Sequence, residues 1–389
     1  MISEKYREMV GNKSVIREIF MYGRMRGKEI GAENVFDYSL GNPSVPVPDH
    51  FTQRMKELLE KEEPVTLHGY SPSLGIDSVR EAVAESLKKR FQMEYKKEHI
   101  FMCSGAAAAI AHALRAVTVP GDSVLTFAPY FPEYGPYVNL TGARLKIVPP
   151  CLKDFQPDLN AFEEMLTEDV TAVLLNTPNN PSGIVFTTET ILELAAIMSR
   201  KEEEYHHDIY LISDEPYREI VFHGVDAPYI SKYYENTISC YSFSKSLSLP
   251  GERIGYIAVS PECKDAELLV EIFGQISRGT GHNCPSSIIQ LAVADCLDET
   301  SDFSVYEKNM ELLFGELTKL GYEIVKPGGT FYMFPKAPGG NSIDFCKKAM
   351  EKDLLLVPGD GFGCPGYFRM AYCINTEKVE RSLEAFRKL

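Results

Sequence analysis

The stretch SFSKSLSLPGERIGY, residues 242–256, joins two apolar runs, TISCYSFS at 237–244 and RIGYIAV at 253–259. Short runs of this kind, bounded by Ser, Gly and Pro, predict two strands with a polar turn between them. The turn places Lys245 close in sequence to Arg253 and several serines. A second cation lowers the pKa of a lysine, and an amine must lose its proton before it can attack a carbonyl carbon. Most of the 40 basic residues are expected to be surface charges, but this setting indicates a nucleophilic lysine beside groups that suit a phosphate-bearing carbonyl compound.

Similar apolar runs precede this stretch and alternate with helical patterns such as residues 78–91 and 106–117. The runs are HIFMC (99–103), SVLTFA (123–128), ARLKIV (143–148), TAVLLN (171–176) and DIYLISD (208–214). Several of them are apolar almost throughout, as strands buried on both faces are, and the intervening helices favour parallel crossovers. We therefore expect an α/β fold whose large domain has a mainly parallel sheet flanked by helices.

The two ends of the sequence have a different pattern. Residues 4–30 have the spacing of an amphipathic helix, and the extended, proline-rich segment 36–48 follows. Beyond Pro285, two helical patterns precede a mixture of strand and helix patterns. We expect a large domain at 47–300 and a smaller α+β domain formed by residues 1–46 and 301–389.

Composition excludes several classes of function. The 389 residues include 55 acidic and 40 basic side chains, a net charge of −15 that would repel nucleic acid and anionic membranes. The nine cysteines show no CxxC pair and no close Cys/His grouping, so we expect reduced thiols and no metal site. The sequence shows no apolar region of a signal peptide and no run of 18 apolar residues, which predicts a cytoplasmic, soluble protein.

Three further stretches combine an apolar run with polar residues. In DIYLISDEPYREIVF (208–222), Asp214 follows a strand pattern and either faces a ligand at the sheet edge or caps the next turn. The turn in LLNTPNNPSG (174–183) is either part of the same edge or an ordinary loop. In CSGAAAAIAHAL (103–114), small residues precede a helix whose first N–H groups either bind an anion or are only capped.

Together the four stretches resemble the pyridoxal-phosphate (PLP) dependent aminotransferases of fold type I, class I/II, which include aspartate aminotransferase. The resemblance runs in order from LGNPSVPVP (40–48) to YFRMAYC (367–373). Its most specific part is SxSKxxxxxGxRxGY preceded by NNPxG and DExY. It implies pyridoxal 5'-phosphate as cofactor, ping-pong transfer of an amino group between an amino acid and a 2-oxo acid, and a homodimer with shared active sites. It also implies cis peptide bonds before Pro129 and Pro181.

The resemblance assigns roles around the cofactor. Lys245 would bind it covalently and move protons, Asp214 would pair with the ring nitrogen, and Tyr217 with Asn180 would hydrogen-bond the phenolic oxygen. Phe131 would stack on the ring, where the family often has tryptophan. The residues that match the phosphate-binding positions are Ser104, Gly105, Ala106, Ser242 and Arg253, together with Tyr70 acting in the neighbouring subunit.

The substrate is less well defined by the sequence. Arg369 resembles the arginine that holds the substrate α-carboxylate, beside Gly41 and Asn180. Ala107 stands where one acidic-substrate branch has lysine, whereas Arg278 resembles a cross-dimer arginine that would bind a second carboxylate. This comparison slightly favours an aspartate/2-oxoglutarate type of substrate.

Other substrates and functions are compatible with the same sequence features. If Arg278 faces solvent, pocket walls such as Tyr130, Tyr134 and Phe362 would favour aromatic or other neutral amino acids. The alternatives to a transaminase are a PLP-dependent C–S β-lyase and an effector-sensing regulatory protein of the same fold. The regulator is disfavoured because the residues before Gly41 are too few for a DNA-binding module.

Overall fold

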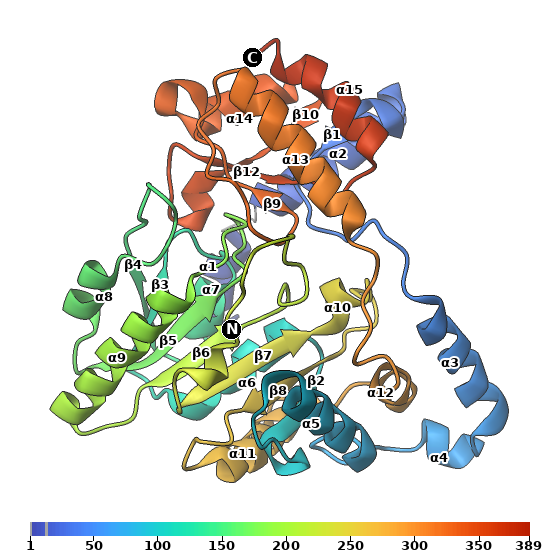
Figure 1. Ribbon diagram of the computed structural model, residues 1–389, viewed down its shortest axis with the longest axis vertical. Helices are drawn as coiled ribbons and strands as arrows, with labels where there is room; N and C mark the ends of the chain where they lie inside the picture. Colours follow the sequence, from blue (N-terminus) through green and yellow to red (C-terminus); the bar gives the residue numbers. More distant parts are fainter. Residues whose placement is uncertain (1, 12–14) are drawn as a thin grey trace.

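The computed structural model describes residues 2–11 and 15–389, and within them the strands form three sheets. A seven-stranded sheet is flanked by helices, and a three-stranded and a two-stranded sheet lie together with the C-terminal helices at one end of the molecule (Figure 1). The α/β architecture with a mainly parallel sheet agrees with the sequence prediction. The strands are β1 Phe36–Asp37, β2 Ile100–Cys103, β3 Ser123–Phe127, β4 Arg144–Val148, β5 Val170–Asn176, β6 Tyr210–Asp214, β7 Thr237–Ser242, β8 Gly255–Val259, β9 Tyr332–Met333, β10 Leu354–Leu355, β11 Val357–Pro358 and β12 Phe368–Ala371.

The large sheet has the order β2-β8-β7-β6-β5-β3-β4. Each of its pairings is parallel except those of β8, which is antiparallel to both β7 and β2. Only the four-residue helix α10 Phe243–Ser246 lies between β7 and β8, and parallel strands need a longer crossover. The expectation of parallel crossovers therefore fails at this one connection.

Helices occupy most of the long connections between the other strands of the large sheet, but the connection from β6 to β7 contains only the 3-10 helix η3. The segment predicted as one helix over 4–30 is helical on both sides of residues 12–14, which lie outside the described residues. The α-helices are α1 Glu4–Gly11, α2 Val15–Ile30, α3 Asp49–Lys61, α4 Pro64–His68, α5 Asp77–Phe91, α6 Ala106–Val117, α7 Tyr134–Asn139, α8 Leu159–Met165, α9 Thr188–Tyr205, α10 Phe243–Ser246, α11 Ala266–Gly279, α12 Ser287–Ala294, α13 Ser304–Lys319, α14 Ser342–Met350 and α15 Thr376–Phe386. Short 3-10 helices are η1 Ala32–Asn34, η2 Lys97–His99, η3 Ile230–Lys232, η4 Pro338–Gly340 and η5 Gly359–Phe362.

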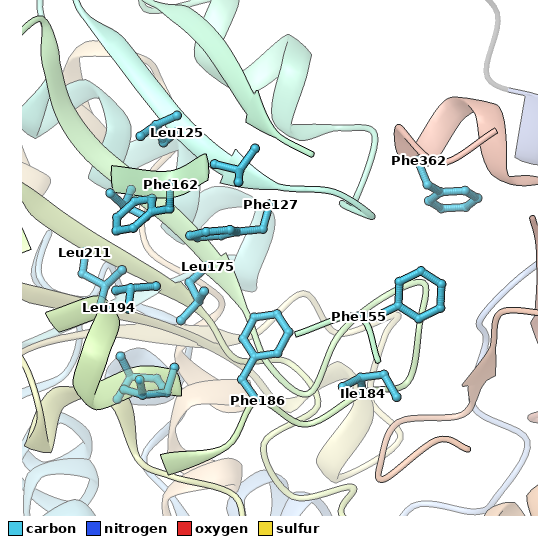
Figure 2. Packing of buried hydrophobic residues seen from close by; sticks show 14 of the residues in the cluster. Leu125, Phe127, Phe155, Phe162, Leu175, Ile184, Phe186, Leu194, Leu211 and Phe362 are labelled. Carbon is cyan, nitrogen blue, oxygen red and sulfur yellow. The ribbon is translucent and has the colours of Figure 1, made fainter. Parts of the chain in front are cut away.

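Both faces of the large sheet are covered, which explains why its strands are apolar at successive positions. On β5, Leu175 packs in one cluster with Phe162 of α8 and Leu194 of α9 (Figure 2). Its neighbour Leu174 belongs to a second cluster with Ala113 of α6. Successive side chains of a strand point to opposite faces, so a strand buried on both faces has no polar alternation.

The smaller sheets join the two ends of the chain. β1 pairs in parallel with β10, with Phe36 opposite Leu354, while β11, β12 and β9 form the antiparallel sheet. An ion pair strengthens this junction, because Nε of Arg26 in α2 donates to Oδ1 of Asp353 at 2.7 Å. The division into a domain of residues 47–300 and a second domain of the two terminal segments stays a prediction. No helix within residues 2–11 and 15–389 combines the length and apolar character needed to cross a membrane.

Candidate active site

Most of the predicted site residues lie together at one edge of the large sheet. Asp214 is the last residue of β6 and Ser242 the last of β7, while Gly105 follows β2. These strands are parallel, so their carboxyl ends lie on the same edge, where ligands of open α/β sheets bind. Arg253 reaches this edge from the other direction because it precedes the antiparallel strand β8.

The residues at the start of α6 have the chemistry of an anion-binding site. Gly105 caps this twelve-residue helix with a φ of 86°, and the first N–H groups of a helix have no partner within it. A side chain on Gly105 would come within 3.1 Å of Nη2 of Arg253 and 3.4 Å of Oγ of Ser242. Arg253 also donates to Oγ of Ser244 at 3.4 Å. Helix N–H groups, hydroxyls and a guanidinium therefore converge on a cradle that a larger residue would fill.

Lys245 lies in α10, directly after β7, and is largely buried. Its Nζ donates to the carbonyl oxygen of Gly41 at 2.7 Å and lies 5.5 Å from the ring centre of Phe331. Burial lowers the pKa of Lys245 to about 8, and the charges of Arg253 and Arg369 act in the same direction. This amine can therefore exchange its proton close to neutral pH, as a nucleophile and general base must.

Asp214 is a buried carboxyl group with one bonded and one free oxygen. Tyr134 donates from its hydroxyl to Oδ2 at 2.6 Å, whereas Oδ1 has no hydrogen-bond partner within the described residues. Burial raises the pKa of Asp214 to about 7, although the hydrogen bond from Tyr134 opposes this shift. A buried, unpartnered carboxylate oxygen is costly unless a cation meets it, so this position fits the protonated ring nitrogen of a pyridine cofactor.

This shift predicts a pH-dependent stability difference in the cofactor-free protein. Since the pKa of Asp214 is raised by folding, its contribution is fully present below about pH 4 and is lost as the pH rises through about 7. The variant Asp214→Asn lacks this loss, so its free energy of unfolding should gain on wild type by up to about 4 kcal/mol between pH 4 and pH 8. Urea unfolding of both cofactor-free proteins across this range measures the difference. Parallel curves would show that Asp214 is not the titrating group.

Arg369, in β12, lies in a buried aromatic enclosure with only 2% of its surface exposed. The guanidinium carbon is 4.7 Å from the ring centre of Tyr332 and 5.0 Å from that of Phe362. Nη1 donates to Oδ1 of Asn180 at 3.1 Å and Nη2 to the carbonyl of Ser39 at 2.5 Å, while Nε has no partner in this part of the chain. A buried guanidinium without a carboxylate partner is suited to bind one from a ligand.

Gly41 is required by close packing. A Cβ at this position would lie 1.8 Å from the hydroxyl of Tyr332, which is itself buried. That hydroxyl also lies 3.1 Å from the hydroxyl of Tyr217, so Tyr332 lies against both Gly41 and Tyr217. Phe131 lies edge-on to Tyr134, with 5.8 Å between the ring centres.

The turn after β5 carries Asn180 into the site. Oδ1 of Asn176 accepts from the backbone N–H of Asn180 at 2.7 Å, and Nδ2 of Asn176 donates to the carbonyl of Asp214 at 2.8 Å. The peptide bonds before Pro129 and Pro181 are cis, which confirms that prediction, and the bond before Pro178 is also cis.

Two predicted residues lie outside this cluster. Tyr70, between α4 and α5, is fully exposed, and Arg278 is exposed in the last turn of α11. Neither side chain makes a hydrogen bond or ion pair recorded for the described parts of the chain. Their predicted roles across a subunit boundary therefore stay predictions.

Sequence reasoning missed several residues that shape the site. Tyr134 was expected only as a pocket wall, yet it holds Asp214 from 80 positions away, a separation that no local pattern reveals. Arg218 directly follows the DEPY segment and would be taken for a surface charge, but its side chain is only 10% exposed and pairs with Glu215 at 2.9 Å and Glu219 at 3.3 Å. Its guanidinium carbon also lies 4.1 Å from the ring centre of Tyr241. The segment after Asp214 is thereby fixed in place.

Comparison with known proteins identifies the family of this chain. The family model for aminotransferase class I and II matches residues 33–386. The aromatic-amino-acid aminotransferase 2 of Thermococcus litoralis is 33% identical over 98% of this chain and 96% of its own, and the aspartate aminotransferase of Thermotoga maritima is 28% identical over 90% of each. A crystal structure of an amino transferase from Eubacterium rectale is 43% identical, with a TM-score of 0.97 over 100% of this chain and 98% of that one. The chain therefore belongs to the class I and II aminotransferases.

Proposed function

We propose that this chain is a PLP-dependent amino-acid aminotransferase in which Lys245 is the proton-transferring base. The observation that carries the proposal is the convergence of Lys245, the unpartnered Oδ1 of Asp214 and the buried Arg369 on one edge of the sheet. An amino acid needs an acceptor for its amino group, a base for its α-proton and a cation for its carboxylate. PLP, when bound, supplies the aldehyde that accepts the amino group and a ring that draws electrons from the α-carbon.

Different residues of the chain would bind different parts of this cofactor. Asp214 would hold a proton on the ring nitrogen, because that cation compensates the burial of its carboxylate. The phenolic oxygen would accept hydrogen bonds from Tyr217 and Asn180, and Phe131 would cover one ring face. The phosphate would be bound by the start of α6 with its neighbouring side chains: Ser104, Gly105, Ala106, Ser242 and Arg253.

Lys245 and Arg369 would act on the substrate. Arg369 would fix the α-carboxylate with two parallel hydrogen bonds and thereby orient the α-carbon toward Lys245. The neutral amine of Lys245 would take the proton from that carbon as general base. It would then donate the proton as general acid later in the reaction. The buried surroundings, including Phe331 and Tyr332, would limit the access of water.

A half-reaction screen tests the proposed function. Purified protein with bound PLP is mixed with one amino acid at a time, and the change in cofactor absorbance is followed. Transamination requires that the spectrum change with an amino acid and revert when a 2-oxo acid is added. Release of pyruvate, ammonia and a thiol from a cysteine-type substrate, without such reversal, would identify a C–S β-lyase instead.

The side-chain specificity is proposed to be of the aspartate/2-oxoglutarate type. Both an aspartate aminotransferase and an aromatic-amino-acid aminotransferase are similar to this chain. Arg278, in the last turn of α11, is exposed and has no ion pair within residues 2–11 and 15–389, so it could bind a second carboxylate in a neighbouring subunit. Measuring kcat/KM for aspartate, phenylalanine and alanine in wild type and Arg278→Ala tests whether Arg278 causes a preference for acidic substrates. An unchanged preference for aspartate in the variant would exclude Arg278 from the site.

The site is proposed to be shared between two subunits of a homodimer. Tyr70 supports this, because this tyrosine of the expected phosphate-binding set is fully exposed and its side chain has no hydrogen bond within the described residues, so it is available to a neighbouring subunit. Analytical ultracentrifugation at micromolar concentration should show a dimer, and Tyr70→Phe should weaken PLP binding without changing the sedimentation. A monomer at that concentration would contradict the arrangement.

A further inference from the structure

A group of three potential metal ligands lies outside the site described above. His50 is near the start of α3, and Cys296 and Glu299 follow α12. Nδ1 of His50 lies 2.5 Å from Oε1 of Glu299 and 4.0 Å from Sγ of Cys296, and all three ligand atoms lie within 4.8 Å of one another. Cys296 is buried, whereas the side chains of His50 and Glu299 are 49% and 36% exposed. The thiol thus closes the inner side of a group that opens to solvent.

We propose that His50, Cys296 and Glu299 bind one divalent transition-metal ion, with Zn²⁺ as the best match to their chemistry. Zinc takes nitrogen, sulfur and carboxylate ligands in a tetrahedral arrangement, and water can fill the fourth position on the open side. With bonds of about 2.0–2.3 Å, its ligand atoms lie roughly 3.3–3.8 Å apart. Sγ of Cys296 is close to this separation from Nδ1 of His50, whereas Oε1 of Glu299 lies nearer, at 2.5 Å, and would move outward by rotation of its exposed side chain. A thiolate, a carboxylate and a neutral imidazole together balance the double charge of the ion.

The local structure holds the ligands on one side of the group. The backbone N–H of Glu299 donates to the carbonyl of Cys296 at 3.1 Å, which forms a turn with the two side chains three positions apart. The nearby cation Arg54 pairs with Asp295, and Asp298 pairs with Lys89 at 2.8 Å. Within the described residues, the ion pair of Glu299 is the one with His50. A metal ion bound here would therefore displace a proton from these ligands and would not compete with a lysine or an arginine for the carboxylate.

The position of this group connects two passages of the chain. The segment before α3 leads from the region of the smaller sheets down to α3, and the segment after α12 leads back up to α13 (Figure 1). His50 lies at the end of the first passage and Glu299 at the start of the second. An ion bound here would cross-link them. The expectation of no metal site was based on the spacing of cysteines and histidines along the sequence. His50 lies 246 positions from Cys296, so only the fold brings these ligands together.

Titration calorimetry of the metal-free, PLP-loaded protein with Zn²⁺ tests the proposal. We expect one high-affinity ion per chain, a higher unfolding temperature with Zn²⁺, and proton release on binding. His50→Ala and Cys296→Ser should each weaken this binding by at least about tenfold, whereas the matched controls His68→Ala and Cys284→Ser should not. His50 is exposed, so His50→Ala should fold normally, which circular dichroism can check. Binding that is absent, or that is equal in His50→Ala and wild type, would overturn the proposal.

Discussion

Lys245→Ala should lower kcat for transamination by a factor of about 10²–10⁴, which is the usual contribution of a positioned general acid or base. The loss is expected because the substitution removes Nζ, the amine that is proposed as the base. In the structure this amine donates to the carbonyl oxygen of Gly41. Burial keeps the pKa of this amine at about 8, where it can accept and return a proton. The variant should still bind PLP, because the cradle at the start of α6 does not involve the lysine. Single-turnover kinetics and PLP titration measure the two effects separately.

Lys232→Ala is the matched control, because Lys232 is an exposed lysine at the end of η3 and its loss should leave kcat unchanged. Borohydride reduction of wild type with PLP, followed by peptide mapping, should place the cofactor on Lys245. Attachment to another lysine, or full activity of Lys245→Ala, would refute the assignment.

Arg369→Met should lower kcat/KM for every amino-acid substrate by about 10²–10⁴. Two charge-assisted hydrogen bonds to the α-carboxylate would be lost, at about 1.5–3 kcal/mol each. Methionine fills much of the same space between the rings of Tyr332 and Phe362 and leaves no unpaired charge behind. Steady-state kinetics with several amino acids measure the loss, and the spectrum of bound PLP checks that the cofactor site is intact.

Arg381→Met provides the comparison, since Arg381 is an exposed arginine of α15. It should have wild-type kinetics. If Arg369→Met lost activity toward one side-chain type alone, Arg369 would instead contact the substrate side chain.

The parts of the site that sequence reasoning located are those that follow strands. Lys245, Asp214 and Gly105 each follow an apolar run, and parallel strands bring such positions to one edge. Arg369 and Gly41 were found through family resemblance, because nothing in the residues around them marks a site.

The parts that could not be predicted depend on contacts between distant segments. The hydrogen bond from Tyr134 to Asp214 and the burial of Arg218 between two carboxylates are properties of packing, which periodicity does not encode. The antiparallel direction of β8 depended on a connection whose helix proved to be only four residues long.

The pairing of β1 with β10 has a consequence for how the molecule is made. The N-terminal strand leaves the ribosome first but cannot gain its hydrogen bonds until Leu354 has been synthesised, near the other end of the chain. Closing so large a loop costs conformational entropy before any contact repays it, so this step should come late in folding. The proposed phosphate-binding residues of this chain that surround the start of α6, by contrast, have all been synthesised once Arg253 has emerged. A nascent chain could therefore form the cradle before the first and last strands meet, and truncation before β10 would leave β1 without its partner.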